Sequence, residues 1–305
     1  MSEPPAPDLL KRLDELTRWI DEGEGLVLGL DFDGTLAAIV DTPAESTLTP
    51  TARVALEEFA SSQSVIPAVV SGRERDDLQQ RVGVDDVVYA GNHGLELAYG
   101  DEELVHPEAE TYRPTISRLC ADIETRLRDV PGCTIEDKGL TATVHFRRVP
   151  DDAVPTVVST VDQVVSNEDG VHVSEGKEIR ELRPSVDWDK GRTMQLLRGV
   201  APERWQTMYL GDDTTDEDAF RAVQPDGLGV RVTEPACDDR VTETAARYRI
   251  EGQETVSLLL AWVGMCLGPR SRRDLRPQPE RSSFSTFTDM SSEDDVSSLS
   301  EWVCE

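Results

Sequence analysis

The sequence has 305 residues, 38% of them hydrophobic and 30% charged, which is enough for one or two domains with a buried core. Its formal net charge of −29 repels nucleic acid and anionic membranes, and we exclude both as partners. Only four of the 31 basic residues are lysines. An acidic, lysine-poor surface suits a protein that stays hydrated in concentrated salt, so we favour a halophilic source; codon bias in a GC-rich genome is the alternative.

Strands and helices alternate in the first part of the chain. Residues 8–21 have apolar side chains near helical spacing and predict a short amphipathic helix. The apolar run 25–30 stops abruptly at Asp31, which indicates a buried parallel strand that delivers a polar loop at its carboxyl end. The alternation predicts a doubly wound, Rossmann-like α/β sheet, with helices at 51–62 and 74–82 and strands at 65–73 and 86–91.

The pattern changes between residues 107 and 184. A helix is followed by two strand-like segments, and this order occurs twice. It predicts a small inserted α+β domain built around an antiparallel sheet. Its helices are expected near 111–129 and 153–165, and its strands at 133–137, 140–147, 171–175 and 177–183.

The first pattern resumes at Lys190, where a helix is expected to begin. Strands at 207–213 and 227–232, a helix at 216–223 and a final helix ending near residue 267 follow. The longest apolar run, Val256–Leu267, is too short to cross a bilayer and predicts a buried helix. We therefore expect a discontinuous core domain (1–106 and 185–267), an inserted domain (107–184) and a disordered tail (268–305) rich in Ser, Pro and charge.

The cysteines and the amino terminus carry no signal for export. The five cysteines are scattered and show no metal-ligand spacing, which argues against a disulfide framework and against a zinc site. The amino terminus lacks a basic segment followed by an apolar one. We expect a cytoplasmic protein.

Two carboxylates follow the first strand. Asp31 and Asp33 are one residue apart and would project toward one side of the loop, with Gly34 permitting the turn and Thr35 offering a hydroxyl. A short acidic pair alone is weak evidence for a catalytic site, since most such pairs lie in solvated turns. The buried strand before this pair makes Asp31 a candidate for chemistry.

A second acidic cluster follows the strand that ends near Gly211. Clustered carboxylates repel one another unless a cation neutralises them, and hard oxygen ligands select Mg²⁺. Asp212 is the strongest candidate ligand in this cluster. Asp216 and Glu217 are also favoured in the first turn of a helix, so capping alone is an alternative for them.

Four segments, in this order and spacing, resemble the motifs of the haloacid dehalogenase superfamily: DFDGT (31–35), the serine of SGR (71), the lysine of DKG (190) and GDDTTDED (211–218). Over about residues 20–262 the chain is most similar to trehalose-6-phosphate phosphatases, in LDFDGTLAAIV, AGNHGLE, GKEIRELRPSVDWDKG and LGDDTTDEDAF. Ala37 and Ala38 replace a proline often seen after DFDGTL, which affects a loop beside the site.

The resemblance implies roles for the motif residues. Asp31 would attack phosphorus and form an aspartyl-phosphate, and Asp33 would serve as general acid and then general base. Mg²⁺ would be held by Asp31, the backbone carbonyl of Asp33 and Asp212. Lys190 would keep Asp31 ionised and, with Thr35 and Ser71, bind phosphoryl oxygens; Asp213 would orient Lys190 or a water molecule.

The resemblance also makes the inserted domain a cap that selects the substrate. Lys177 and Glu181 are the better candidates for sugar contacts, and Arg183 shares their strand face. Arg147, Lys138 and His145 are weaker ones, with a solvated strand face as the alternative. His93 would touch substrate or be structural, and Arg73 would reach the sugar phosphate or an internal carboxylate; we include both among the candidate substrate contacts.

The function expected from this set is hydrolysis of trehalose 6-phosphate to trehalose and phosphate. One alternative keeps the chemistry and changes the sugar, as in sucrose-6-phosphate phosphatases or phosphomannomutases. Another is a regulatory binding protein on a degenerate phosphatase fold, which predicts loss of Asp31, Asp33, Lys190 or Asp212, and all four are present. We expect a monomer, with association with a trehalose-phosphate synthase left open.

Overall fold

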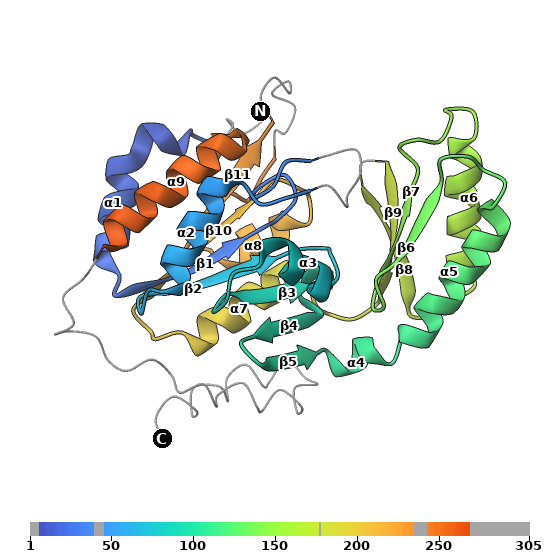
Figure 1. Cartoon of the computed structure of the whole chain (residues 1–305), viewed down its shortest axis with the longest axis horizontal. Helices are drawn as coiled ribbons and strands as arrows, with labels where there is room; N and C mark the ends of the chain where they lie inside the picture. Colours follow the sequence, from blue (N-terminus) through green and yellow to red (C-terminus); the bar gives the residue numbers. More distant parts are fainter. Residues whose placement is uncertain (1–5, 40–45, 177, 235–242, 269–305) are drawn as a thin grey trace. The chain divides into compact units, whose positions relative to one another are not determined.

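The structure is a computed structural model that describes residues 6–39, 46–176, 178–234 and 243–268 (Figure 1). The chain divides into two compact units. The core unit comprises residues 1–104 and 188–305, and the inserted unit comprises residues 105–187. The inserted unit thus interrupts the core unit once, and each unit has its own sheet and apolar core.

The core unit is built on an eight-stranded sheet with the order β12-β11-β10-β1-β2-β3-β4-β5. Six neighbouring strands, from β12 to β3, pair in parallel, and β4 pairs antiparallel with β3. The strands are β1 (Gly25–Leu30), β2 (Val65–Val70), β3 (Val88–Gly91), β4 (Glu96–Tyr99), β5 (Glu102–Val105), β10 (Trp205–Gly211), β11 (Leu228–Thr233) and β12 (Tyr248–Glu251).

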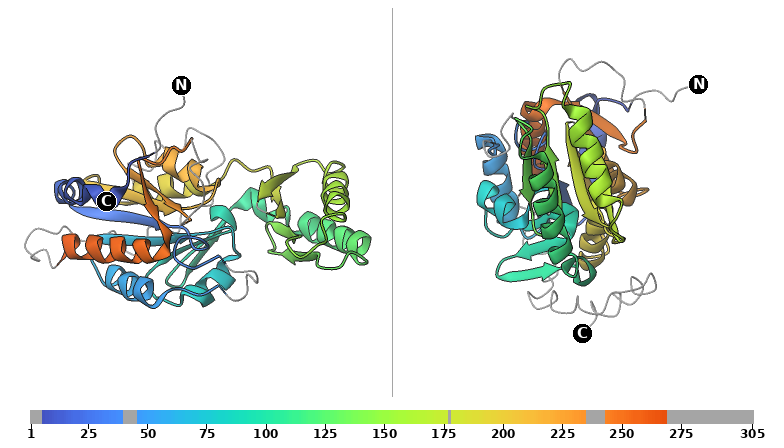
Figure 2. Two further views of the ribbon diagram at one scale, coloured as in Figure 1. Left: turned by 90° about the horizontal axis from the view of Figure 1, so that it is seen from above. Right: turned by 90° about the vertical axis from the view of Figure 1, so that its right-hand side faces the viewer.

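Helices cover both faces of this sheet, as the views from the front and from above show (Figures 1 and 2). Successive side chains of a strand point to opposite faces, so Leu26, Leu28 and Leu30 of β1 enter one apolar cluster and Val27 enters the other. The first cluster includes side chains of α1 (Leu13–Glu22), α2 (Pro50–Ala60), α3 (Arg75–Val82) and α9 (Gly252–Leu267). The second includes side chains of α7 (Lys190–Val200) and α8 (Asp216–Ala222).

The described residues of the core unit also include the short 3₁₀ turns η1 (Leu9–Arg12) and η3 (Asn92–Gly94). The apolar run near the end of the described chain is helix α9, as expected. In the described segments, no helix combines the length and the apolar character needed to cross a membrane.

The inserted unit has a four-stranded antiparallel sheet with the order β6-β7-β9-β8. Val144 and Leu182 point to one face of this sheet and share an apolar cluster with side chains of α5 and α6. The unit consists of α4 (Pro107–Glu110), α5 (Arg113–Leu127), β6 (Thr134–Asp137), β7 (Ala142–His145), α6 (Val154–Val165), β8 (Val171–Gly176) and β9 (Ile179–Pro184).

The expected fold class is confirmed: an α/β core with helices on both faces carries an inserted α+β unit. The sequence analysis missed three strands, β4, β5 and β12. Each is four residues long, and β4 pairs antiparallel with the last strand of the parallel set, β3, with β5 beyond it at the edge of the sheet. The expected tail, 268–305, lies outside the described residues apart from Gly268.

Candidate active site

The loop after β1 carries Asp31 at the carboxyl edge of the parallel sheet. The backbone N–H of Asp31 donates to the Leu210 carbonyl (2.9 Å), so the loop after β1 is fixed to the neighbouring strand β10. The Asp31 side chain is buried. The two acidic motifs of the sequence therefore meet, because β1 and β10 are parallel neighbours whose ends lie at one edge.

Lys190 joins these two motifs. Its Nζ lies 2.7 Å from Asp31 Oδ1 and 2.7 Å from Asp216 Oδ1, and all three side chains are buried. Asp189 caps helix α7 by accepting from the Arg192 N–H (2.8 Å), which places Lys190 at the first helical position. The cap thus fixes the backbone from which the Lys190 side chain extends.

Asp216 receives a full set of donors. Its Oδ1 also accepts from the Tyr209 hydroxyl (2.7 Å), and its Oδ2 accepts from the Asp213 N–H (2.9 Å). Both oxygens are therefore engaged by the protein. Asp216 acts here as the buried counter-charge that orients Lys190 toward Asp31.

A group of three carboxylates could hold a metal ion. Asp31, Asp212 and Asp216 each offer one oxygen, and these oxygens lie within 4.8 Å of one another. Because both oxygens of Asp216 already accept hydrogen bonds, Asp31 and Asp212 are the better ligands. A hard-oxygen donor set of this kind suits a small divalent cation.

Burial raises the pKa of two carboxyls, those of Asp31 and Asp212. For Asp31, burial outweighs the attraction of Lys190, and Asp216 and Asp212 add to the rise in pKa. For Asp212, burial first and then the charges of Asp216 and Asp213 raise the pKa to about 7. The pKa of Lys190 is raised by Asp216 and Asp31, which outweigh its own burial, so the lysine stays charged.

Gly34 lets the loop after β1 approach Asp212. Its φ is +84°, a left-handed conformation that favours glycine, and a Cβ there would overlap the Asp212 carboxylate. The Thr35 hydroxyl is fully buried and lies 3.4 Å from Asp212 Oδ1. Thr35 is thus placed beside the acidic group.

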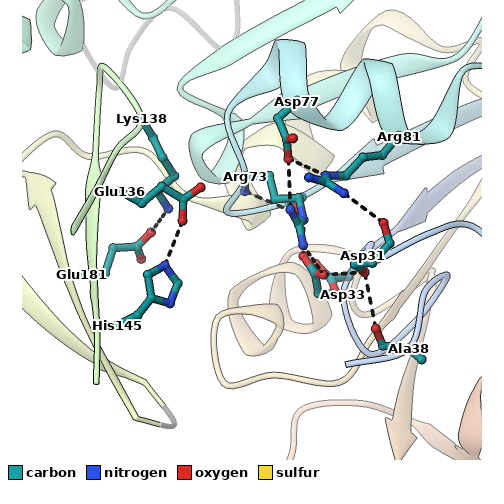
Figure 3. Close-up of polar contacts among 12 residues, drawn as sticks. Asp31, Asp33, Ala38, Arg73, Asp77, Arg81, Glu136, Lys138, His145 and Glu181 are labelled. Carbon is teal, nitrogen blue, oxygen red and sulfur yellow. Dashed lines mark hydrogen bonds and ion pairs between the residues drawn. The ribbon is translucent and has the colours of Figure 1, made fainter. Parts of the chain in front are cut away.

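The Asp33 carboxylate is held by Arg73 rather than by Lys190 (Figure 3). Arg73 Nε donates to Asp33 Oδ2 (2.6 Å), and Arg73 Nη2 donates to Asp33 Oδ1 (2.7 Å). Arg73 Nη1 donates to Asp77 Oδ2 (3.0 Å). Of the two readings that the sequence left open for Arg73, the structure shows the contact with internal carboxylates.

Ser71 and His93 lie together at the ends of β2 and β3. Ser71 is buried, and its carbonyl accepts from the His93 N–H (2.8 Å). His93 has a φ of +61°, unusual for a side chain with a Cβ, and its ring lies over Gly72, where a Cβ would come within 2.8 Å. The two residues support each other at the same sheet edge as Asp31.

Asp213 and Glu217 have other neighbours than the sequence suggested. Asp213 is exposed, and Asp216 takes the place against Lys190 that Asp213 was expected to fill. Glu217 accepts from Arg231 Nη1 (2.8 Å), Thr244 Oγ1 (2.7 Å) and the Ala245 N–H (2.7 Å), so it ties α8 to β11 and the segment before β12. Sequence reasoning missed Asp216, because a carboxylate at a helix start also reads as a cap.

The candidate contacts in the inserted unit form ion pairs of their own. Lys138 Nζ donates to Glu181 Oε1 (2.7 Å), and both residues are buried. His145 Nε2 lies 2.9 Å from Glu136 Oε2, as Figure 3 also shows, and Arg147 Nε lies 2.8 Å from Glu178 Oε2. Arg183 is half-buried on β9, and Lys177 lies outside the described residues.

Comparisons with known proteins identify the family of the chain. The family model described as trehalose-phosphatase matches residues 29–254. The trehalose-phosphate phosphatase of Mycobacterium marinum is 38% identical over 232 residues, which are 74% of this chain and 58% of that protein. The chain therefore spans about three fifths of the length of this relative.

Solved structures show the same fold. The crystal structure of a trehalose-6-phosphate phosphatase related protein is 25% identical with a TM-score of 0.68, covering 78% of this chain and 97% of that one. The C-terminal domain of a C. albicans trehalose-6-phosphate phosphatase is 22% identical with a TM-score of 0.70, covering 88% and 99%. A haloacid dehalogenase-like hydrolase from Bacteroides thetaiotaomicron has a TM-score of 0.54 at 14% identity, covering 78% and 98%.

This protein shares the fold of a haloacid dehalogenase-like hydrolase, an α/β core with an inserted unit, and it carries Asp31, Lys190 and Asp212 at one edge of the core sheet. Its four motif segments meet in the core unit, as the resemblance implied. The chain belongs to the trehalose-phosphatase family.

Proposed function

We propose that this protein hydrolyses trehalose 6-phosphate to trehalose and phosphate through an aspartyl-phosphate on Asp31. The observation that carries the proposal is the buried ion pair of Asp31 with Lys190, at 2.7 Å, beside Asp212. Lys190 opposes the rise in the pKa of Asp31 that burial causes, and so favours the ionised, nucleophilic form of the carboxylate in a site that can accept a phosphate ester. The match to the trehalose-phosphatase family supports the substrate.

The reaction runs in two displacements. In the first, an oxygen of Asp31 attacks phosphorus, the bond from phosphorus to the sugar oxygen breaks, and Asp33 donates a proton to that oxygen. In the second, water attacks the aspartyl-phosphate, Asp33 accepts a proton from the water, and the bond from phosphorus to Asp31 breaks. Phosphate leaves and the Asp31 carboxylate is restored.

The residues around Asp31 bind and orient the phosphoryl group. Lys190 offers its charge to a phosphoryl oxygen, and the hydroxyls of Thr35 and Ser71 are hydrogen-bond donors for the others. Because Asp216 holds Lys190 from the far side, the lysine does not need to reorganise as charge moves during the reaction. Asp213 is left to orient water at the exposed mouth.

Mg²⁺ fits the oxygen donors of Asp31 and Asp212, and the family resemblance adds the backbone carbonyl of Asp33 as a further ligand. When bound, it would shield the negative charges that meet during phosphoryl transfer. It would also relieve the repulsion that helps to raise the pKa of Asp31 and Asp212.

The inserted unit is proposed to choose the sugar. Glu181 and Arg147 are the candidate contacts among its described residues, and Lys177 completes the set from the same sequence segment. His93 is the candidate contact in the core unit. The buried pair of Lys138 with Glu181 would hold the Glu181 carboxylate for a sugar hydroxyl.

A substrate panel tests the proposal. Phosphate release is measured from trehalose 6-phosphate, sucrose 6-phosphate, mannose 6-phosphate and glucose 6-phosphate, with Mg²⁺ and with a chelator, at low and molar salt. We expect the highest kcat/KM for trehalose 6-phosphate and loss of turnover with the chelator. Faster turnover of another sugar phosphate would contradict the assignment of trehalose 6-phosphate and make that compound the substrate. Activity in the chelator would contradict the Mg²⁺ assignment.

The cytoplasmic location, the monomeric state and association with a trehalose-phosphate synthase stay predictions. If the chain were instead a regulatory binding protein, it would bind the sugar phosphate without releasing phosphate. The same panel separates this alternative from the enzyme.

A further inference from the structure

Asp33 belongs to a closed circuit of polar contacts that joins the segment between β1 and α2, the loop between β2 and α3, and helix α3 (Figure 3). Arg73 binds both oxygens of Asp33, at 2.6 and 2.7 Å, in the planar two-point geometry that fits a carboxylate. The guanidinium also lies over the Phe32 ring, 5.4 Å from its centre. One edge and one face of Arg73 are therefore fixed against the loop after β1.

The circuit continues through α3. Asp77 Oδ2 accepts from Arg73 Nη1 (3.0 Å) and from Arg81 Nε (2.7 Å). Arg81 Nη1 then donates to the Ser46 carbonyl (3.0 Å). Asp77 and Arg81 are one helical turn apart, so a rigid helix carries both.

Ser46 closes the circuit. Its hydroxyl is buried and lies 3.0 Å from Asp33 Oδ1, the oxygen that Arg73 Nη2 also contacts. Oδ1 thus accepts two hydrogen bonds, whereas Oδ2 accepts one from the described residues, from Arg73 Nε. A carboxylate oxygen has two lone pairs, so Oδ2 is the oxygen that can meet the leaving group or water.

Asp33 is the most exposed of the four charged side chains in the circuit. The side chain of Asp33 is 39% exposed, that of Asp77 is 32% exposed, and those of Arg81 and Arg73 are 16% and 10% exposed. Burial alone would raise the pKa of Asp77, but hydrogen bonds from Arg81 and Arg73 outweigh burial and lower it. Asp77 is therefore held in its charged form between the two arginines.

We propose that Asp77 and Arg81 are positioning residues that act through Arg73 and Ser46 to fix the Asp33 carboxylate with Oδ2 directed at the leaving-group oxygen. The inference rests on the proposed function, since it assigns the circuit to the acid step of that reaction. A half-exposed aspartate on a loop would otherwise change rotamers, and proton transfer depends on close heavy-atom geometry. Because Asp77 and Arg81 both lie on helix α3, the helix holds the contacts of Arg73 and Ser46 in place.

The test compares two substrates with different leaving groups, because only a loss of proton transfer from Asp33 affects them unequally. General damage to the enzyme would lower turnover of both. A sugar alkoxide needs a proton to leave, whereas p-nitrophenolate leaves without one. In the full chain, Asp77→Asn should lower kcat/KM for the sugar phosphate by on the order of 10-fold or more, and for p-nitrophenyl phosphate by less than about 3-fold. kcat/KM is the right quantity because it reports the steps up to formation of the aspartyl-phosphate.

Asp76→Asn is the matched control. Asp76 is the neighbouring aspartate on the same helix, its side chain is 70% exposed, and it pairs with Arg75 outside the circuit. This variant should keep both kcat/KM values within about 2-fold of the unchanged protein. Arg81→Gln should repeat the selective loss of Asp77→Asn, and it serves in its place if that variant is unfolded by circular dichroism.

An equal loss on both substrates, or no loss on either, would overturn the positioning role. It would leave the proposed function standing, provided the unchanged protein hydrolyses the sugar phosphate. Absence of turnover by the unchanged protein on every phosphate ester would instead overturn the proposed function and the inference together.

Discussion

Asp212 has a pKa raised from 3.8 to about 7, mainly by burial and then by Asp216 and Asp213. Between these two values the unfolded chain has lost the proton while the folded protein still holds it. The free energy of unfolding of the metal-free protein should therefore fall as pH rises from about 4 to about 7.

Asp212→Asn should remove the part of this pH dependence that Asp212 contributes, while the raised pKa of Asp31 keeps the rest. In a chelator at pH 8 we expect the variant to be more stable than the unchanged protein by on the order of 1–3 kcal/mol, with the difference vanishing near pH 4. Urea unfolding at both pH values measures it. Mg²⁺ at pH 8 should stabilise the unchanged protein and not the variant, and a variant less stable at pH 8 would contradict this explanation.

Gly34 tests the close approach of the loop after β1 to Asp212. Gly34→Ala combines a left-handed backbone with an overlap on the carboxylate, whereas Gly100→Ala has φ of +59° and open space around the added methyl. Both should lose about 1 kcal/mol of stability from the backbone. Only Gly34→Ala should also lose most of its kcat, as phosphate release would show; equal activities would argue against the close approach.

Two residues show what the sequence could and could not predict about the site. Asp31 was predictable because a buried strand ends on it, and the structure places it beside Lys190 as the motifs implied. Asp216 was not, because it stands in a run of acidic residues at a helix start and only the fold reveals that Lys190 reaches it. The sequence indicated two candidate partners for Arg73, the sugar phosphate and an internal carboxylate, and the folded distances show its contact with the Asp33 carboxylate.

At the scale of elements, α7 links a helix cap to the chemistry. Asp189 caps α7, and Lys190 is the first residue of that helix. Thr49 caps α2 in the same way, by accepting from the Ala52 N–H (3.2 Å), and serves as the control. Asp189→Ala and Thr49→Ala should each cost about 1 kcal/mol of stability. Only Asp189→Ala should also lower kcat, because it loosens the residue next to Lys190.

Thermal unfolding and phosphate release together measure this difference. Similar kcat values for the two cap variants would mean that packing of α7, rather than its cap, sets the position of Lys190.

The elements themselves were largely predictable, because the buried parallel strands are continuous apolar runs and the helices have clear starts. The strand β12 (Tyr248–Glu251) was not, because Arg249 and Glu251 alternate with Tyr248 and Ile250 over only four residues. Pairing with β11 makes this segment a strand, and pairing is a property of the fold rather than of the segment.

At the scale of the whole molecule, the net charge of −29 should make stability depend on salt. Mutual repulsion destabilises a compact acidic chain, and the Debye length falls from about 30 Å at 0.01 M to about 10 Å at 0.1 M salt. We expect the urea midpoint to rise steadily with NaCl over this range, and activity to persist at molar salt. A midpoint independent of salt would argue against the halophilic interpretation.

The aspartyl-phosphate on Asp31 is the central claim, and rapid acid quench of a reaction with ³²P-labelled trehalose 6-phosphate tests it most directly. Label should appear on the intact protein before free phosphate, be released by hydroxylamine, map to the peptide that contains Asp31, and be absent in Asp31→Asn. Label on another residue, or undiminished turnover by Asp31→Asn, would contradict the account.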